Sequence, residues 1–424
     1  MQKPYGKLAG YAHGFIKDII ETFGPRYAGS EAEMKANKWI EDELAGFTDE
    51  VHLETYQVHP DLYPQGIIKM TGGCGLVAPI FMGFGVPWVI IAAACIFLGV
   101  FILFSELVML KRWIKPFFKK ATSSNVFGII NPSGKIKRTI VFEGHTDSAK
   151  QMRLAEYDKI PLKRFLLGVL YLPFIVVFSL LKFIGLLVPG GPIDTIARAG
   201  PLYWTAVDWI FLPLLPVLLY FFIFVIRGFM GDTVVPGASD NLSGSAVSAA
   251  VGKYFFEHRP RNVRLVIGSM GSEEIGDQGA KVFVARHGDL LENSYGYIID
   301  DSGVGNKFHV IVEDKMHRAK YDPEVYERML KAAERYRKEM PDAFPVEKKT
   351  IPLGSSDACM YVKAGYKASF IIGFHEVQGE TEKLSKPPNW HSIRDTWQNI
   401  EKKMLRDGIG MAINFVEMVD EELD

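Results

Sequence analysis

The sequence predicts an α/β protein whose mostly parallel, mixed β-sheet is sandwiched between helices and which carries two inserted transmembrane helical hairpins. Three observations lead to this fold class. Strand-like and helix-like segments alternate over most of the chain. Two long apolar blocks interrupt that alternation. Clusters of polar residues stand where the predicted strands end, which is where open α/β sheets bind ligands.

Composition excludes several classes of protein. The 424 residues carry 48 basic and 49 acidic side chains, so no overall field favours binding to nucleic acid, and we expect no nucleic-acid partner. The three cysteines lie far apart and show no CxxC spacing, which favours buried thiols over disulfides or zinc knots. Residues 1–18 have no continuous apolar core, so we expect no cleaved signal peptide.

The N-terminal part begins with two helices and a strand. Apolar residues recur at helical spacing over residues 6–23, and Ser30 with Glu33 forms a capping box that opens a second helix over residues 31–46. Residues 51–58 alternate between apolar and polar, as a half-buried strand does. The predicted function of Glu33 is therefore no more than helix capping.

The first apolar block covers residues 67–110 and is too long for one membrane span. Glycine and proline near residue 85 divide it into a weaker span over residues 67–84 and a stronger one over residues 88–110. Basic and aromatic residues follow directly, as they often do at a membrane interface. Strand patterns resume at residues 125–131 and 138–142.

The second apolar block predicts another hairpin, with spans over residues 165–188 and 204–226 and a turn at residues 189–192. Both faces of these segments are apolar, which favours membrane spans over the alternative of two buried helices in a large soluble core. Lys182 is the exception, because it places a charge inside the first of these spans.

The expected membrane topology follows from the need for an even number of crossings in each insertion. If the strands before and after the first insertion belong to one sheet, each insertion must return to the side it left, so we expect four spans in two hairpins. Basic residues flank the spans on the side of the soluble domain, which the positive-inside rule places in the cytoplasm. We thus expect a multi-pass integral membrane protein in contact with the lipid bilayer, with soluble parts at 1–60, 121–160 and 231–424 and insertions at 61–120 and 161–230.

Beyond residue 226 the chain returns to α/β alternation, which predicts a mostly parallel sheet covered on both faces. The expected helices are 242–258, 278–287, 323–339 and 397–419, and the expected strands are 263–269, 295–299, 308–313 and 368–372.

Polar clusters at strand ends supply candidate metal ligands. His145 follows one predicted strand, and His391 lies in a second cluster near the C-terminus. Together with several carboxylates, these imidazoles are the ligand set expected of zinc or a similar divalent metal. Two imidazoles and three carboxylates suffice for two ions that share one bridging carboxylate, while an unligated carboxylate can accept the proton of a water molecule. Each of these polar clusters, taken alone, is only weak evidence for a metal site.

In combination and order, the motifs resemble the co-catalytic di-zinc aminopeptidase family, which is typified by secreted bacterial leucyl aminopeptidases and has carboxypeptidase-like and glutaminyl-cyclase relatives. The resemblance covers most of the chain outside the apolar insertions. It rests on GPRYAGS at 24–30, HTD at 145–147, SDNLSG at 239–244, SEEIGDQGA at 272–280, IIDDSG at 298–303, LGSSD at 353–357 and HSIRDT at 391–396.

The resemblance implies a role for each matching residue. Asp240 would bridge two metal ions; His145 and Asp300 would complete the shell of one ion, and Glu274 and His391 that of the other. Asp301 is the alternative to Asp300, which is preferred because the Asp-x-x-Gly pattern places it at the ligand position and strand alternation lets only one of them point inward. Glu273 would be the general base and then the acid, and Asp147 would orient His145.

Three departures from the family pattern affect the expected substrate preference more than the metal site. The gap between His145 and Asp240 is enlarged to hold the second apolar block, and Trp390 stands where many members have a tyrosine that stabilises the oxyanion. The family's SDH motif is replaced here, since Ala358 stands at the histidine position.

The implied function is that of a membrane-embedded di-zinc aminopeptidase with a peptide substrate; cobalt or manganese could replace zinc. The alternatives are an endopeptidase or carboxypeptidase that acts near the bilayer, and a catalytically inactive receptor-like module. Glutaminyl cyclase chemistry ranks lower, because it uses one zinc.

Overall fold

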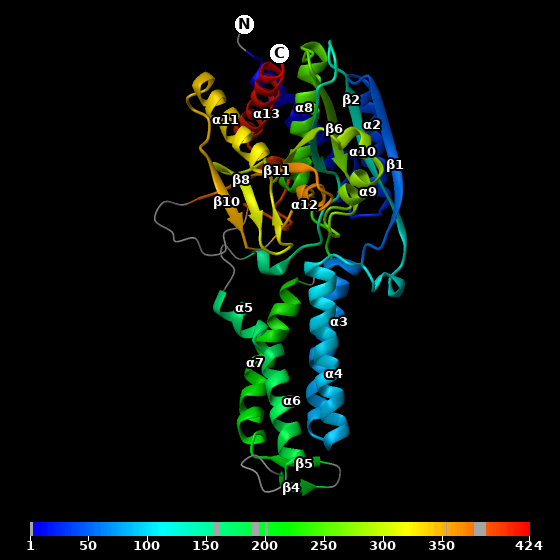
Figure 1. Ribbon diagram of the computed structural model, residues 1–424, viewed down its shortest axis with the longest axis vertical. Helices are drawn as coiled ribbons and strands as arrows, with labels where there is room; N and C mark the ends of the chain where they lie inside the picture. The colour runs from blue at the N-terminus through cyan, green and yellow to red at the C-terminus, as the bar shows by residue number, and fades with distance from the viewer. Residues whose placement is uncertain are drawn as a thin grey trace. The chain divides into compact units, whose positions relative to one another are not determined.

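The computed structural model describes residues 3–156, 162–188, 195–199, 202–229, 231–352, 354–376 and 387–424. The chain forms two compact units. Unit 1 consists of Met1–Pro60, Phe118–Gln151 and Asp232–Asp424, and unit 2 of Asp61–Phe117 and Met152–Gly231. Figure 1 labels the elements of both. The turn expected at residues 189–192 and Leu353 of the LGSSD motif lie outside the described residues.

Unit 1 is built on one mixed sheet. Within the described residues its strand order is β1-β2-β6-β3-β7-β11-β8-β10, and β9 pairs with β8. The four central strands β6, β3, β7 and β11 run parallel to one another. Strand β2 is antiparallel to both of its neighbours, whereas β8 is antiparallel to β11 and parallel to β10. The bounds are β1 Glu50–Val58, β2 Ala121–Ile130, β3 Arg138–His145, β6 Val263–Met270, β7 Ser294–Asp300, β8 Lys307–Asp314, β9 Ala319–Lys320, β10 Val346–Ile351 and β11 Lys367–Phe374.

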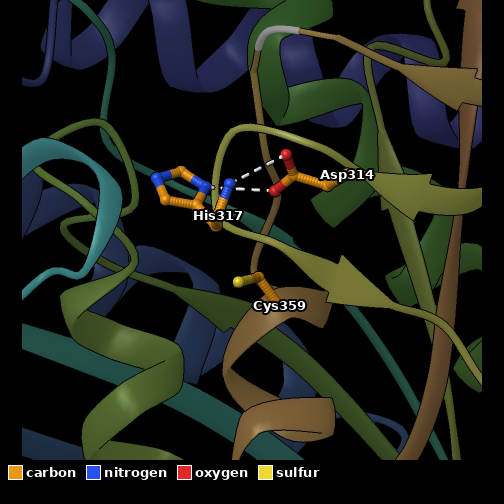
Figure 2. Close-up of side chains that lie close together, drawn as sticks. All are labelled: Asp314, His317 and Cys359. Carbon is orange, nitrogen blue, oxygen red and sulfur yellow. Dashed lines mark hydrogen bonds and ion pairs between the residues drawn. The ribbon is translucent and has the colours of Figure 1, made fainter. Parts of the chain in front are cut away.

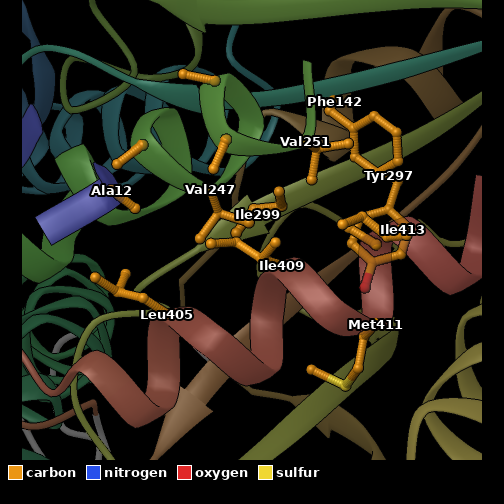
Figure 3. Packing of buried hydrophobic residues seen from close by; sticks show 14 of the residues in the cluster. Ala12, Phe142, Val247, Val251, Tyr297, Ile299, Leu405, Ile409, Met411 and Ile413 are labelled. Atoms are coloured by element: carbon orange, nitrogen blue, oxygen red, sulfur yellow. The ribbon is translucent and has the colours of Figure 1, made fainter. Parts of the chain in front are cut away.

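Helices cover both faces of this sheet, because both faces of the central strands are apolar. One face carries α1, α2, α8, α11 and α13, whose side chains form the main core with alternate residues of the strands (Figure 3). The other face carries α9, whose Phe283 contacts Phe127 of β2, and α12. The bounds are α1 Tyr5–Phe23, α2 Glu31–Ala45, α8 Ser243–Glu257, α9 Gln278–Arg286, α10 Gly288–Leu291, α11 Pro323–Glu339, α12 Ala358–Lys363 and α13 Lys402–Glu422.

The expected α/β architecture is confirmed, and the strands on both sides of the first insertion do belong to one sheet. The structure adds β10 and α12, which the sequence pattern did not predict. Strand β10 has the sequence VEKKTI and lies at the edge of the sheet, where charged residues are common and hide the apolar alternation. Helix α12 has only six residues, too few for a helical period to appear.

Unit 2 contains the apolar helices. These are α3 Ile67–Met82, α4 Val86–Ile102 with a π-helical continuation Leu103–Val108, α5 Leu162–Val169, α6 Tyr171–Leu187 and α7 Asp208–Phe229, together with the short hairpin β4 Thr195–Ala199 and β5 Leu202–Thr205. Small residues allow close packing of these helices. A Cβ added to Gly99 of α4 would lie 2.9 Å from the Cβ of Cys74 in α3, and one added to Gly75 would lie 2.8 Å from the ring of Phe222 in α7.

Large apolar side chains of unit 2 face outward. The exposed fractions of Phe97, Trp209 and Ile80 are 73%, 67% and 63%. Among the described residues, three helical segments are long and apolar enough to cross a membrane: Val86–Val108, Lys163–Leu187 and Asp208–Phe229. Helix α3, expected as the fourth span, has 16 residues, which at 1.5 Å per residue is shorter than a typical hydrocarbon core of about 30 Å.

The charge of Lys182 has a partner. Its Nζ lies 2.7 Å from Oδ1 of Asp208, and both side chains are buried. The other oxygen of Asp208 accepts hydrogen bonds from the backbone N–H and the hydroxyl of Thr205. A buried ion pair with these additional hydrogen bonds reconciles a lysine with an otherwise apolar helix.

Candidate metal centre

The candidate ligands gather at one edge of the unit 1 sheet. His145 ends β3, Asp300 ends β7, and Glu273 and Glu274 follow β6. Because these three strands are parallel and adjacent, their carboxyl ends meet at the same edge. Asp240 joins them from the irregular turn before α8.

Asp240 lies between the two candidate histidines. Its Oδ1 is 3.3 Å from Nε2 of His145, and its Oδ2 is 3.3 Å from Nε2 of His391. Nε2 of His391 is also 3.1 Å from Oε2 of Glu274. Each oxygen of one carboxylate thus faces a different imidazole, which is the arrangement required of a ligand that bridges two ions.

The remaining carboxylates fall into two groups. Ligand atoms of His145, Glu273 and Asp300 all lie within 4.8 Å of one another, and so do those of Asp240, Asp300 and Asp301. Asp300 therefore approaches His145, whereas Asp301 groups only with the other two aspartates. This difference is in line with the choice of Asp300 as a ligand over Asp301.

The electrostatics of the cluster suit cations. Burial, reinforced by neighbouring carboxylates, raises the pKa of Asp300 to about 7 and that of Glu273 well above its ordinary value. Although burial opposes protonation of His391, Glu274 and Asp240 raise its pKa to about 10. Nε2 of His145, Oε1 of Glu274 and Oδ1 of Asp300 are buried but make no hydrogen bond within the described part of the chain. Divalent cations would satisfy these atoms, so the residues present fit a metal site.

Asp147 has a wider set of contacts than the sequence predicts. Its Oδ1 and Oδ2 accept hydrogen bonds from the backbone N–H groups of Glu273 and Glu274, at 3.0 and 3.1 Å. Oδ1 lies 3.5 Å from Nδ1 of His145, while the backbone oxygen of Asp147 is closer to that nitrogen, at 3.1 Å. The carboxylate therefore fixes the backbone of the adjacent glutamates as well as facing the histidine.

Three further buried residues support the site, and sequence reasoning assigned none of them a role in it. Asp395 accepts hydrogen bonds from the backbone N–H groups of Ser239 and Asp240. Ser30 caps the helix as expected by accepting from the backbone N–H of Glu33, while the carboxylate of Glu33 accepts from the backbone N–H groups of Gly29 and Ser272. Arg26 donates to the backbone oxygens of residues 24, 146 and 237. The only sequence signals for these residues were the position of Arg26 and Asp395 inside the GPRYAGS and HSIRDT motifs and the capping-box spacing of Glu33.

Two departures from the family pattern can be located in the structure. The indole of Trp390 stacks on the ring of His391, with ring centroids 4.1 Å apart and an angle of 29° between the planes. Asp357, next to Ala358, is fully buried, and burial followed by repulsion from Glu143 raises its pKa well above the ordinary value. This stacking restricts the orientation of the imidazole ring.

Comparison with known proteins supports the resemblance. Residues 227–416 match the model of peptidase family M28. A search of curated proteins found no match. In fold, the chain is similar to the zinc aminopeptidase BSAP from Bacillus subtilis, with 14% identity and a TM-score of 0.53 over 97% of this chain and 95% of that chain.

Two further solved structures have the same fold. The aminopeptidase from Aneurinibacillus sp. strain AM-1 is 14% identical, with a TM-score of 0.51 over 96% of this chain and 93% of that chain. The glutaminyl cyclase from Porphyromonas gingivalis is 13% identical, with a TM-score of 0.54 over 97% of this chain and 98% of that chain. The resemblance read from the motifs is thus confirmed at two levels: residues 227–416 match the model of peptidase family M28, and the chain has the fold of solved zinc aminopeptidases.

Proposed function

We propose that the protein is a membrane-embedded di-zinc aminopeptidase that hydrolyses the N-terminal residue from peptides. One observation carries this proposal: the carboxylate of Asp240 presents one oxygen to His145 and the other to His391. A carboxylate in this position can bridge two ions and hold them close enough to act on one substrate bond.

The five proposed ligands divide between two ions. His145 and Asp300 would hold one, Glu274 and His391 the other, and Asp240 both; cobalt or manganese are alternatives to zinc. When bound, the ions would polarise the scissile carbonyl and lower the pKa of a water molecule.

Glu273 is the proposed general base. Its side chain is 13% exposed, so it can be reached by water, and its Oε2 lies 3.5 Å from Nε2 of His145 at the centre of the cluster. It would accept a proton from the attacking water and then donate it to the leaving amine. Asp147 would keep Glu273 in place through its backbone N–H, and the indole N–H of Trp390 is the proposed donor to the oxyanion.

Glu273→Gln tests the mechanism in the purified full-length chain. We expect the variant to keep its bound metal but to lose about 10²- to 10⁴-fold in the rate of hydrolysis of aminoacyl reporter substrates, since a positioned base typically contributes that much. Glu257→Gln, an exposed change at the end of α8, is the matched control and should retain full activity. An active Glu273→Gln variant would refute the mechanism, and a metal-free wild type would favour the inactive receptor-like module.

Peptides with blocked termini separate the peptidase classes. An aminopeptidase cannot cut N-acetylated peptides, whereas an endopeptidase or carboxypeptidase still can. If acetylated peptides are cut at wild-type rates, the aminopeptidase assignment is wrong and one of these alternatives replaces it.

A glutaminyl cyclase is the second candidate function, because a solved glutaminyl cyclase has a fold as similar as those of the aminopeptidases. A peptide that begins with glutamine distinguishes the two. Mass spectrometry would show loss of ammonia with the chain length unchanged for a cyclase, and release of the first residue for an aminopeptidase.

The proposed location is a membrane, with unit 1 in the cytoplasm. Support comes from three apolar helical segments of sufficient length and from the outward-facing apolar side chains of unit 2. In cell fractionation the protein should be found with the membranes and should remain there after alkaline extraction. A protease added to intact cells should leave a C-terminal tag uncut, and cleavage of that tag would contradict the cytoplasmic orientation.

A further inference from the structure

Unit 1 contains another cluster of metal-ligating side chains, separate from the candidate metal centre. Asp314 ends β8, His317 lies in the turn that follows, and Cys359 lies in the first turn of α12 (Figure 2). The exposed fractions of the three residues are 0%, 4% and 0%. A carboxylate, an imidazole and a thiol thus meet in the interior from two segments that are far apart in sequence.

The geometry brings their donor atoms together. Nδ1 of His317 is 3.0 Å from Oδ2 of Asp314, and one ligand atom of each of the three residues lies within 4.8 Å of the other two. Ligands of one tetrahedral zinc ion, with bonds of about 2.0–2.3 Å, lie roughly 3–4 Å apart. The cluster therefore needs only small side-chain movements to surround one ion.

The turn that carries His317 is already fixed. The backbone N–H of His317 donates to Oδ1 of Asp314 at 3.1 Å, so the carboxylate holds the loop as well as the imidazole. Two of the three ligands would therefore be in place before an ion binds, which lowers the conformational cost of binding.

The chemistry of the donor set favours zinc or a similar ion. Thiolate and imidazole are soft and borderline ligands that select zinc over magnesium or calcium. Burial first, and then the charge of Asp277, raises the pKa of the Cys359 thiol to about 12. A cation among these residues would favour the thiolate and compensate for the buried negative charge.

We propose that Asp314, His317 and Cys359 bind one zinc-class divalent ion at a structural site in addition to the candidate metal centre. Such an ion would connect the end of β8 to α12. Asp357 directly precedes that helix and interacts electrostatically with Glu273. The site would therefore stabilise the segment of chain that borders the candidate metal centre, and it does not depend on the proposed peptidase activity.

Cobalt spectroscopy tests this site without any measurement of activity. Purified full-length chain is stripped of metal and loaded with Co²⁺ alone. The candidate metal centre offers only nitrogen and oxygen ligands, so a thiolate-to-cobalt charge-transfer band in the near ultraviolet must come from a cysteine. We expect this band in the wild type, its loss in Cys359→Ser, and its retention in Cys95→Ser, which changes a cysteine of unit 2.

Further variants keep the test decisive. His317→Gln leaves the thiol in place and should weaken the band and lower metal content by about one ion per chain, so it replaces Cys359→Ser if that variant fails to fold. Asp240→Asn should leave the band unchanged, which separates this site from the proposed function. No band in the wild type, or a band that persists in both Cys359→Ser and His317→Gln, would overturn the proposal.

Discussion

Replacement of Asp147 by asparagine is the sharpest test of how the candidate centre is held. The carboxylate accepts hydrogen bonds from the backbone N–H groups of Glu273 and Glu274 and is itself fully buried. An asparagine of the same shape can accept from only one of them, and its NH₂ group would face the other N–H. The change therefore weakens one bond by about 1 kcal/mol and leaves a buried donor unpaired at about 1–3 kcal/mol.

These contributions add up to about 2–4 kcal/mol, shared between the stability of the fold and the affinity for metal. We expect metal affinity to fall about 10- to 100-fold, as is typical when a residue that orients the ligands is changed. Equilibrium competition with a chelator of known affinity, with metal counted by mass spectrometry, measures the effect on the full-length chain. Hydrolysis rates at saturating metal then measure how much the change impairs the proposed base Glu273.

Ser148→Ala is the matched control for this experiment. Ser148 is equally buried and adjacent, and its hydroxyl accepts one hydrogen bond from the backbone N–H of Arg26. The loss of that neutral bond should change metal affinity by no more than about fivefold, since its net value is about 1 kcal/mol and none of the five proposed ligands takes part in it. If Asp147→Asn binds metal as tightly as this control, the proposed support of the glutamates is refuted.

Three other predictions concern stability and are checked by thermal or denaturant unfolding. Gly144→Ala should destabilise unit 1 by about 3 kcal/mol or more, because the added Cβ would lie 2.4 Å from the backbone nitrogen of residue 245. Gly10→Ala is the control: a Cβ added there meets nothing within 4 Å, so the change should be neutral or stabilising. Burial and nearby lysines lower the pKa of His309 from 6.5 to about 4, so folding disfavours its protonation. The contribution of His309 to the free energy of unfolding should be fully present above pH 6.5 and decrease toward pH 4. His309→Gln should flatten that decrease. Lys182→Met should cost about 3–5 kcal/mol by leaving Asp208 without its cation, and an added Asp208→Asn should recover part of the loss.

Periodicity predicted the elements that bury one regular face. Helix α11 has the expected bounds, and the ends of the central strands differ from expectation by at most three residues. It did not predict β10, whose charged residues suit a sheet edge, or α12, which is shorter than two turns. Helix α3 begins at Ile67, where the first span was predicted to begin, but it ends at Met82 and has only 16 residues, whereas the three described segments long enough to span a membrane have 22 to 25.

For the site, the sequence supplied residues with metal-binding side chains at strand ends, and the structure brings them together. The sequence did not predict the residues that support the site through hydrogen bonds to the backbone. Asp395 and Arg26 hold main-chain groups of segments far away in sequence, and nothing in their own surroundings predicts those partners. Contacts of this kind depend on the assembled topology, so they can be found only in three dimensions.

The interleaving of the two units has a consequence for biosynthesis. The first 151 residues of the chain include β2 and β3, yet β6, which pairs with both, begins at Val263. A ribosome adds about 5–20 residues per second, so these strands remain without their partner for several seconds while the second apolar insertion is translated. During that interval the edges of β2 and β3 that later pair with β6 are open to aggregation. Early capture of the apolar segments by the insertion machinery would tether the unfinished sheet, and the nascent chain should depend on chaperones until residues 263–270 emerge.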